Sequence, residues 1–355
     1  MHGAIYSDTG YALALSHSHA LVWPYSTNTT SPETFKFLLP YPTKLNSDPL
    51  PLGSLVSPPA SSPEPGLVVV MPTTGKITYW ESVASASTMD LIRQQRSGVE
   101  LAISGMLSGE SVVQVLNAEP AGFVLAFSSG RLAYMNVRDG QGRPSISLQF
   151  LRGTAGTGGG GIFGSLRNAL SSSSWRGNLA AARAAPVLKP GERDVVTVTS
   201  KGRLQAWNLH RGGHYSLQAE AEVRESIVLA MKETNSALTN LSLETFELLD
   251  FAFAPLPVSS SGLPAGDTGA HLLLLTSLSG RGLSYYALVP AVLRADSLEI
   301  GIIRHLKSYT TPVNRAATSK PRLYLPRPAL AYSSSSDTRS RRRSACRAPG
   351  SRSRS

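Results

Sequence analysis

Cysteine, acidic side chains and long apolar runs are scarce in this 355-residue chain. The single cysteine, Cys346, excludes an internal disulfide bond and a metal site built on several thiolates. No stretch has the roughly 20 consecutive apolar residues that a transmembrane helix needs. Charged residues make up only 16% of the chain, and residues 153–190 include no aspartate or glutamate. The apolar share of 41% is ordinary for a globular protein, and we expect a globular fold.

The net charge of +11 is unevenly distributed. Residues 333–355 contain seven arginines and one aspartate, and the rest of the chain carries only +5. A folded nucleic-acid-binding domain concentrates Lys and Arg on its own surface. We therefore expect no direct nucleic-acid partner.

A short turn signature recurs along the chain. A glycine is followed by a basic residue and then by an apolar segment that ends at a large side chain. The copies are Gly75-Lys76-Ile77 to Trp80, Gly130-Arg131-Leu132 to Met135, Gly202-Arg203-Leu204 to Trp207 and Gly280-Arg281 to Tyr285, with a weaker one from Ser18 to Trp23. We expect the glycine at a positive-φ turn position, the basic residue in solvent and the large residue between sheets.

Short strands at this density predict an all-β fold, a β-propeller of about five four-stranded blades. The clearest unit has strands at 112–116, 122–127, 131–137 and 145–151. Further strands are expected at 4–6, 11–15, 21–25, 34–39, 66–71, 194–199, 202–209, 215–219, 226–231, 271–275, 282–288 and 297–305. Residues 89–96 are expected to be helical.

Composition divides the chain into four parts. Residues 1–152 are expected to hold three blades, and residues 191–330 further blades. Between them, residues 153–190 form a long Gly/Ser-rich insertion. Residues 331–355 form a Ser/Arg-rich tail, for which we expect disorder and a frame error or an artefact of the gene model; a genuine RNA-binding or nuclear-import segment is the alternative.

Several of these segments resemble one family. The residues that carry the resemblance are Ala4-Ile5-Tyr6-Ser7-Asp8, Val22-Trp23-Pro24-Tyr25, Gly75 to Ser82 and Ala126 to Leu132. Together they are similar to the N-terminal β-propeller of nucleoporins of the 133/155 type, with fungal members the more similar, over residues 2–326. The family implies a seven-bladed propeller followed by a helical stack. By that standard the first blade lacks a strand, about two blades are missing after Pro326, and the propeller is incomplete.

The resemblance also implies a function. Members are structural parts of the Y-shaped outer-ring complex of the nuclear pore, at the nuclear envelope, where they support mRNA export and protein import. The implied partners are other Y-complex nucleoporins, although the main contact belongs to the helical domain. No enzyme activity, cofactor or small-molecule substrate is expected.

The insertion contains a candidate amphipathic helix. Ile162, Phe163, Leu166 and Leu170 share one face at helical spacing, opposite a small and nearly uncharged face. Such a helix binds bilayers through packing defects and so prefers curved membrane. Trp175 and Leu179 join this face if the helix breaks within Ser171–Ser174. The resemblance implies a lipid-packing-sensor motif in this loop; the alternative is a disordered loop with incidental apolar residues.

Other functions fit the residues less well. A WD-like interaction propeller or a coat adaptor in membrane traffic is the main alternative. Residues 156–164 match G-x-G-x-x-G, but the preceding strand is expected in an antiparallel meander and the acidic residue of a dinucleotide site is missing. His17 and His19 form a possible metal pair without a third ligand. The four turn cations could also form a basic ring.

Overall fold

The computed structural model divides the chain into two compact units, residues 1–199 with 204–220, and residues 200–203 with 221–355. It describes residues 2–27, 29, 31–39, 48–59, 62–89, 91–152, 177–254, 269–280, 282–312, 320–325 and 333–335.

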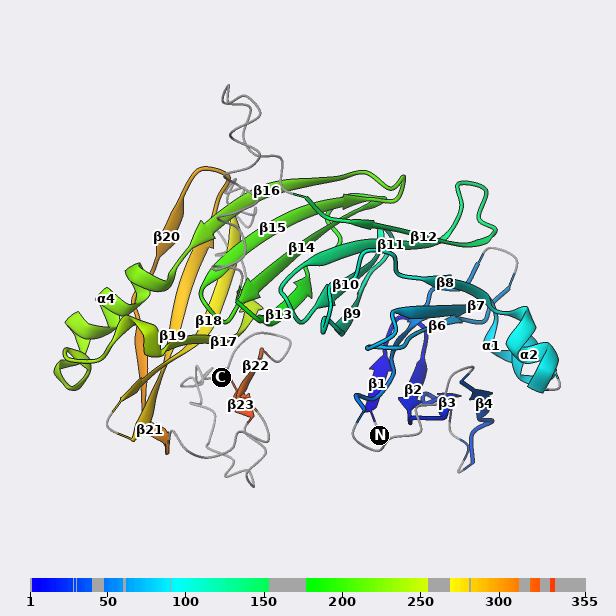
Figure 1. The fold of residues 1–355 in the computed structure, drawn as a ribbon, viewed down its shortest axis with the longest axis horizontal. Coiled ribbons are helices and arrows are strands. Elements are labelled where there is room, and N and C mark those ends of the chain that lie inside the picture. Colours follow the sequence, from blue (N-terminus) through cyan, green and yellow to red (C-terminus); the bar gives the residue numbers. More distant parts are fainter. Residues whose placement is uncertain are drawn as a thin grey trace, which may run out of the picture. The chain divides into compact units, whose positions relative to one another are not determined.

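Sheets A, B and C, and nearly all of sheet D, make up the described part of the first unit (Figure 1). Sheet A contains β1 (His2–Tyr6), β2 (Tyr11–Leu15), β3 (His19–Pro24) and β4 (Phe35–Leu38). Sheet B contains β5 (Leu52–Val56), β6 (Gly66–Val70), β7 (Lys76–Trp80) and β8 (Val99–Ala102). Sheet C contains β9 (Val112–Ala118), β10 (Gly122–Phe127), β11 (Leu132–Arg138) and β12 (Pro144–Phe150). Sheet D contains β13 (Leu179–Ala184), β14 (Glu192–Thr199), β15 (Arg203–His210) and β16 (Tyr215–Glu222).

Helices α1 (Val83–Ser87) and α2 (Leu91–Ser97) connect β7 to β8, which confirms the helical prediction there. The buried amide of Gln94 attaches them to the neighbouring strands. It donates to the carbonyl oxygen of Lys36 at 3.1 Å and accepts from the amide of Leu38 at 3.2 Å. The indole of Trp80 donates to the Gln94 carbonyl oxygen at 2.8 Å. The helices therefore cover the outer edge of sheet A, which would otherwise expose unpaired backbone groups.

Neighbouring sheets of the first unit share apolar cores. Phe37 of sheet A and Trp80 of sheet B meet in one cluster, with ring centroids 5.2 Å apart. Val70 of sheet B and Phe123 of sheet C belong to the next cluster. Each fully buried large side chain stabilises the fold by about 1.5–3 kcal/mol. Strand β9 lies against both β5 and β13, so the first strands of successive sheets lie side by side. Sequential four-stranded sheets packed in this way are the blades of a propeller.

The described part of the second unit centres on sheet E. Its strands are β17 (Phe246–Phe253), β18 (Ala270–Gly280), β19 (Leu283–Leu293), β20 (Leu298–Ile300) and β21 (Arg304–Pro312), the last paired with β19. Helix α4 (Arg224–Thr234) and the 3-10 turns η1 (Ser236–Leu238) and η2 (Leu243–Thr245) precede the sheet. A two-stranded sheet joins β22 (Arg322–Tyr324) to β23 (Ser333–Ser335). The prediction of an all-β propeller with about five blades is confirmed.

Five details of the predicted fold are wrong. Sheet A has four strands, so its blade lacks none. The strand expected at 226–231 is part of helix α4, and the strand expected at 297–305 is divided between β20 and β21. The fourth strand of sheet D is instead β13, which lies inside the segment 153–190 that was expected to be an insertion. Finally, β23 places a short strand at the start of the tail.

The turn signature is correct in three copies. Gly75, Gly130 and Gly202 have φ of 66°, 80° and 94°. In the fourth copy the positive φ, 79°, belongs to Gly282, because β18 continues through Gly280. Glycine is required at these turns because a side chain would strain the left-handed backbone.

Candidate functional site

The predicted membrane-contacting residues fall largely outside the part of the chain that the structure describes. Ile162, Phe163, Leu166, Leu170 and Trp175 all lie in the segment 153–176, which is not described. The ends of this segment are described, and they show how the loop is attached.

Leu179 does not lie on the predicted amphipathic helix, and this part of the prediction is wrong. It is the first residue of β13, where it pairs with Thr199 of β14. Its half-buried side chain packs on the cluster formed by sheets C and D. The backbone N–H and C=O groups of this segment form hydrogen bonds with β14 and not with the preceding turn of a helix. The segment 153–176 is named the insertion from here on.

Both ends of the insertion are attached to the same core. On the N-terminal side, the amide of Leu151 donates to the carbonyl oxygen of Leu132 at 2.9 Å, and the hydroxyl of Tyr215 donates to the carbonyl oxygen of Phe150 at 3.2 Å. Leu151 and Leu179 pack against one cluster, which includes Trp207. The insertion therefore starts and ends at the interface between sheets C and D.

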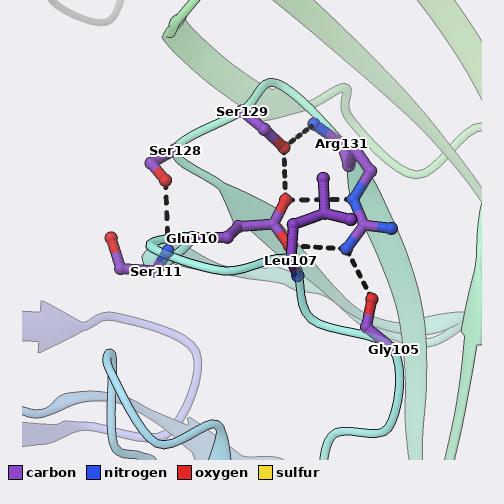
Figure 2. Close-up of polar contacts among 7 residues, drawn as sticks. All are labelled: Gly105, Leu107, Glu110, Ser111, Ser128, Ser129 and Arg131. Carbon is purple, nitrogen blue, oxygen red and sulfur yellow. Dashed lines mark hydrogen bonds and ion pairs between the residues drawn. The ribbon is translucent and has the colours of Figure 1, made fainter.

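A polar network holds the entrance to the insertion in place (Figure 2). Its centre is Glu110, whose side chain is only 2% exposed. The Arg131 Nε donates to Glu110 Oε1 at 2.9 Å, and a second guanidinium nitrogen contacts Oε2. The Leu107 amide donates to Oε2 at 2.9 Å, and the Ser129 hydroxyl donates to Oε1. The carboxylate thus joins the loop before β9 to the hairpin between β10 and β11.

The arginine of this network also packs against aromatic rings. The guanidinium carbon of Arg131 lies 4.3 Å from the ring centroid of Phe150 and 5.7 Å from that of Phe127. Its Nη2 donates to the carbonyl oxygen of Gly105 at 2.8 Å. Planar stacking combined with several hydrogen bonds suits arginine better than lysine. Phe150 ends β12, so the network fixes the strand from which the insertion departs.

Two opposing effects act on the Glu110 carboxyl. Burial raises its pKa, because it disfavours the charged form. The hydrogen bonds from Arg131, the Leu107 amide and Ser129, together with the arginine charge, lower it. The second group of effects prevails, and the pKa of Glu110 lies below its ordinary value.

The sequence predicted that the basic residue of each turn faces solvent, and this prediction is wrong for Arg131 and Lys76. Arg131 is occupied as described above. The Lys76 ammonium lies 2.8 Å from the Glu100 carboxylate, and the lysine side chain is 21% exposed. Arg203 is half-buried on β15, and Arg281 lies outside the described residues. Internal pairing at Lys76 and Arg131 argues against a basic ring.

The first unit also contains a polar cavity, which the sequence did not predict. It has a volume of about 1030 Å³ and is lined by residues from all four sheets of that unit. Three arginines, Arg138, Arg193 and Arg211, contribute to its wall. Arg138 and Arg211 follow the large anchors Met135 and Trp207 by three and four residues. This similar placement after two anchors was the only sign in the sequence that the two arginines could lie close together.

The structure adds no support for a metal site at His17 and His19 or for a dinucleotide site after β12. His17 Nε2 lies 3.1 Å from the carbonyl oxygen of Asp48, and His19 Nδ1 lies 2.8 Å from the hydroxyl of Ser18. The described residues contain no group of three or more His, Cys, Asp and Glu positioned for a metal ion. Strand β12 is antiparallel to β11, as expected, and so is not the first strand of a βαβ unit. Of the helices that the structure describes, none meets the length and apolarity needed to cross a bilayer.

Comparison with known proteins gives consistent results. The family described as Nup133 N terminal like matches residues 1–341. Nucleoporin NUP133 of Chaetomium thermophilum is 54% identical over 339 residues, which cover 93% of this chain and 25% of that protein. Nucleoporin NUP133 of Saccharomyces cerevisiae is 24% identical over 92% of this chain and 27% of its own length. The chain thus spans about a quarter of these relatives.

A solved structure shows the same fold. The crystal structure of the Nup133 β-propeller domain of Vanderwaltozyma polyspora superposes with a TM-score of 0.66. It is 21% identical in sequence, and the match covers 91% of this chain and 73% of that one. At this identity the likeness concerns the fold.

Proposed function

The chain belongs to the Nup133 N-terminal-like family of nucleoporins, and from this premise we propose that it is a structural component of the nuclear pore that contacts curved membrane. The observation that carries the proposal is the 54% identity to a nucleoporin over 93% of the chain. Nucleoporin relatives indicate localisation at the nuclear pore complex of the nuclear envelope. The role is one of scaffolding rather than catalysis.

The partners we propose are other nucleoporins of the outer-ring Y-complex, and through them the chain supports mRNA export and protein import. Its own contribution is a first unit of four packed blades with one attached loop. Adjacent blades of the first unit share apolar cores, which suits a scaffold rather than a part that opens and closes.

The membrane contact is proposed for the insertion alone. Its apolar residues are Ile162, Phe163, Leu166, Leu170 and Trp175, and Leu179 is excluded because it belongs to β13. Each large side chain buried in lipid contributes about 1.5–3 kcal/mol before the cost of ordering the loop. Since the insertion carries only two arginines and no acidic residue, lipid charge adds little, and apolar packing defects decide the affinity.

The pore assignment is tested by imaging. A fluorescent fusion of the chain, expressed in a fungal cell beside a tagged nucleoporin, is expected to concentrate at the nuclear rim in the same foci. A diffuse signal throughout the cell would contradict the assignment.

The membrane contact is tested by flotation with neutral liposomes. The 355-residue chain is expected to float with small, highly curved vesicles and to bind much less to large ones. The variant Phe163→Asp with Leu166→Asp should lose binding, because two charges replace two apolar contacts. The matched control, Asn168→Asp with Ser172→Asp, adds the same charge at polar positions and should retain most of it. Equal binding to both vesicle sizes would disprove curvature sensing.

A further inference from the structure

The cavity of the first unit is large enough for part of a partner molecule. Its volume of about 1030 Å³ lies at the upper end of ligand sites, which run from about 300 to 1,000 Å³. Its wall includes the β1–β2 turn, the segment after β5, the β9–β10 turn, the β11–β12 hairpin and the β15–β16 turn. All four sheets of the unit therefore present loops to one space, which suits an extended ligand.

Two of the carboxylates that line the cavity already accept hydrogen bonds from within the unit, Glu119 mainly from the segment after β5 and Asp139 from its own turn. Glu119 accepts from the Ser57 amide at 3.0 Å, from the Ser57 hydroxyl at 2.9 Å and from the Asn117 amide group at 3.1 Å. Asp139 accepts from the amide and the Nε of Arg143, both at 2.9 Å. Glu119 joins two neighbouring sheets and Asp139 stabilises its own turn, so little of their hydrogen-bonding capacity remains for a cationic ligand.

The arginines are in the opposite situation. The Arg138 Nη2 donates to the carbonyl oxygen of Ser57 at 2.9 Å, and the Arg193 Nη1 donates to that of Glu119 at 3.2 Å. Both partners are neutral, and the Nε of each arginine has no hydrogen-bond partner in the described part of the chain. Burial lowers the pKa of Arg193, and the nearby charge of Asp8 opposes this effect. Half-buried guanidinium groups without a paired carboxylate favour an anionic ligand.

Exposed apolar side chains accompany these cations. Ile5 is 71% exposed and Val187 is 46% exposed, and both line the cavity. The lining aromatics offer little ring surface to bases: Phe123 is 1% exposed, and Tyr6 is half-buried and packs on the cluster shared by sheets A and B. A single-stranded nucleic acid needs such stacking surfaces. The lining therefore fits a peptide better than a nucleic acid.

We propose that this cavity binds an extended acidic peptide segment of a partner protein. Its carboxylates pair with Arg138, Arg193 and Arg211, and its apolar side chains pack on Ile5 and Val187. Side chains alternate between two faces of an extended peptide, so acidic and apolar residues at alternate positions meet the two parts of the wall.

The test uses the full 355-residue chain and a fluorescent peptide of alternating Glu and Leu, with binding followed by anisotropy. The variants Arg193→Gln and Arg211→Glu are each expected to weaken binding about tenfold or more, because each removes a charge-assisted contact. Arg211 lies in an exposed turn and makes no side-chain hydrogen bond or ion pair with any described residue, so its variant should fold. Arg152→Glu, at an exposed arginine outside the lining, is the matched control and should change affinity less than twofold.

A variant of opposite sign separates binding from misfolding. Asp8→Asn removes the lining carboxylate that acts on Arg193 and should strengthen binding of the Glu–Leu peptide. A Lys–Leu peptide and an oligouridylate are the competing probes, and both are expected to bind at least tenfold more weakly than the Glu–Leu peptide. The proposal is overturned if the Glu–Leu peptide does not bind, if either competing probe binds as tightly, or if Arg211→Glu and Arg152→Glu behave alike.

Discussion

The hairpins of sheets B and C share one sequence signature and differ in what their cations do. In sheet B, Lys76 makes an ion pair with Glu100, a residue whose side chain is 37% exposed. In sheet C, Arg131 pairs with Glu110, which is 2% exposed, and stacks on Phe150. The turn glycines have similar positive φ, so the local conformation is the same.

The difference shows that the shared signature determines the conformation of the turn but not how much the ion pair of its basic residue stabilises the fold. The partner of Lys76 comes from the adjacent strand of its own sheet. The partner of Arg131 comes from the loop that leads into β9, 21 residues earlier in the chain. The two cations are about equally exposed, at 21% for Lys76 and 20% for Arg131, and only in the second pair is the carboxylate buried. The second pair also connects separate segments, and the strand after its hairpin leads into the insertion.

The largest expected effect is the loss of the buried carboxylate. Glu110→Ala leaves the Arg131 guanidinium without its anion and removes the acceptor for the Leu107 amide, so the free energy of unfolding should fall by about 3 kcal/mol. Glu100→Ala removes a half-exposed partner and should cost less than about 1 kcal/mol. Urea unfolding of both variants measures the difference. Equal losses would show that the two hairpins are energetically alike.

A smaller effect should appear in the pH dependence. The pKa of Glu110 is lowered in the folded chain, so its charge contributes stability above the ordinary glutamate pKa of about 4.3. That contribution is lost as pH falls through the lower folded pKa. The gap in unfolding free energy between the natural chain and Glu110→Gln should therefore be constant near neutral pH and shrink in acid. A gap that widens in acid would mean that the folded pKa is raised.

Local pattern was sufficient for most strands of this fold, and long-range pairing explains where it failed. Ile227 and Val228 are β-branched and predicted a strand, but they belong to α4, which buries both of them with Met231. The strand of sheet D that the sequence did not predict is Leu179–Ala184, an alanine-rich segment with little strand propensity. Its pairing with β14 outweighs that propensity, and no local signal reports a partner that lies beyond a turn.

The misplaced fourth turn has a similar cause. Glycine in a strand can serve close packing as well as a turn. A Cβ on Gly280 would lie 2.1 Å from Cδ2 of Leu241, so that leucine side chain would have to shift if Gly280 were replaced. The turn itself uses Gly282. The two glycines did indicate a tight spot in the backbone. The sequence could not show which of them forms the turn and which one packs against a neighbouring side chain.

The candidate sites were predictable to different degrees. The insertion was visible as composition, because Gly, Ser and Ala are enriched and acidic residues are missing. Its true end was not visible, since that depends on the pairing of Leu179 with Thr199. The arginines of the cavity come from three separate strands or turns, Arg138, Arg193 and Arg211. Their convergence depends on how sheets C and D pack, so spacing along the chain could not reveal it.

The central claim is that the blades form a frame and that lipid contact belongs to the insertion. It is tested most directly by replacing residues 153–176 with a Gly-Ser linker of equal length. Leu151 and Leu179 remain in their shared core, so the thermal unfolding midpoint should stay unchanged. In the flotation assay, binding to small neutral liposomes should be lost completely. If the linker variant floats as well as the natural chain, the blades carry the contact and the account is wrong.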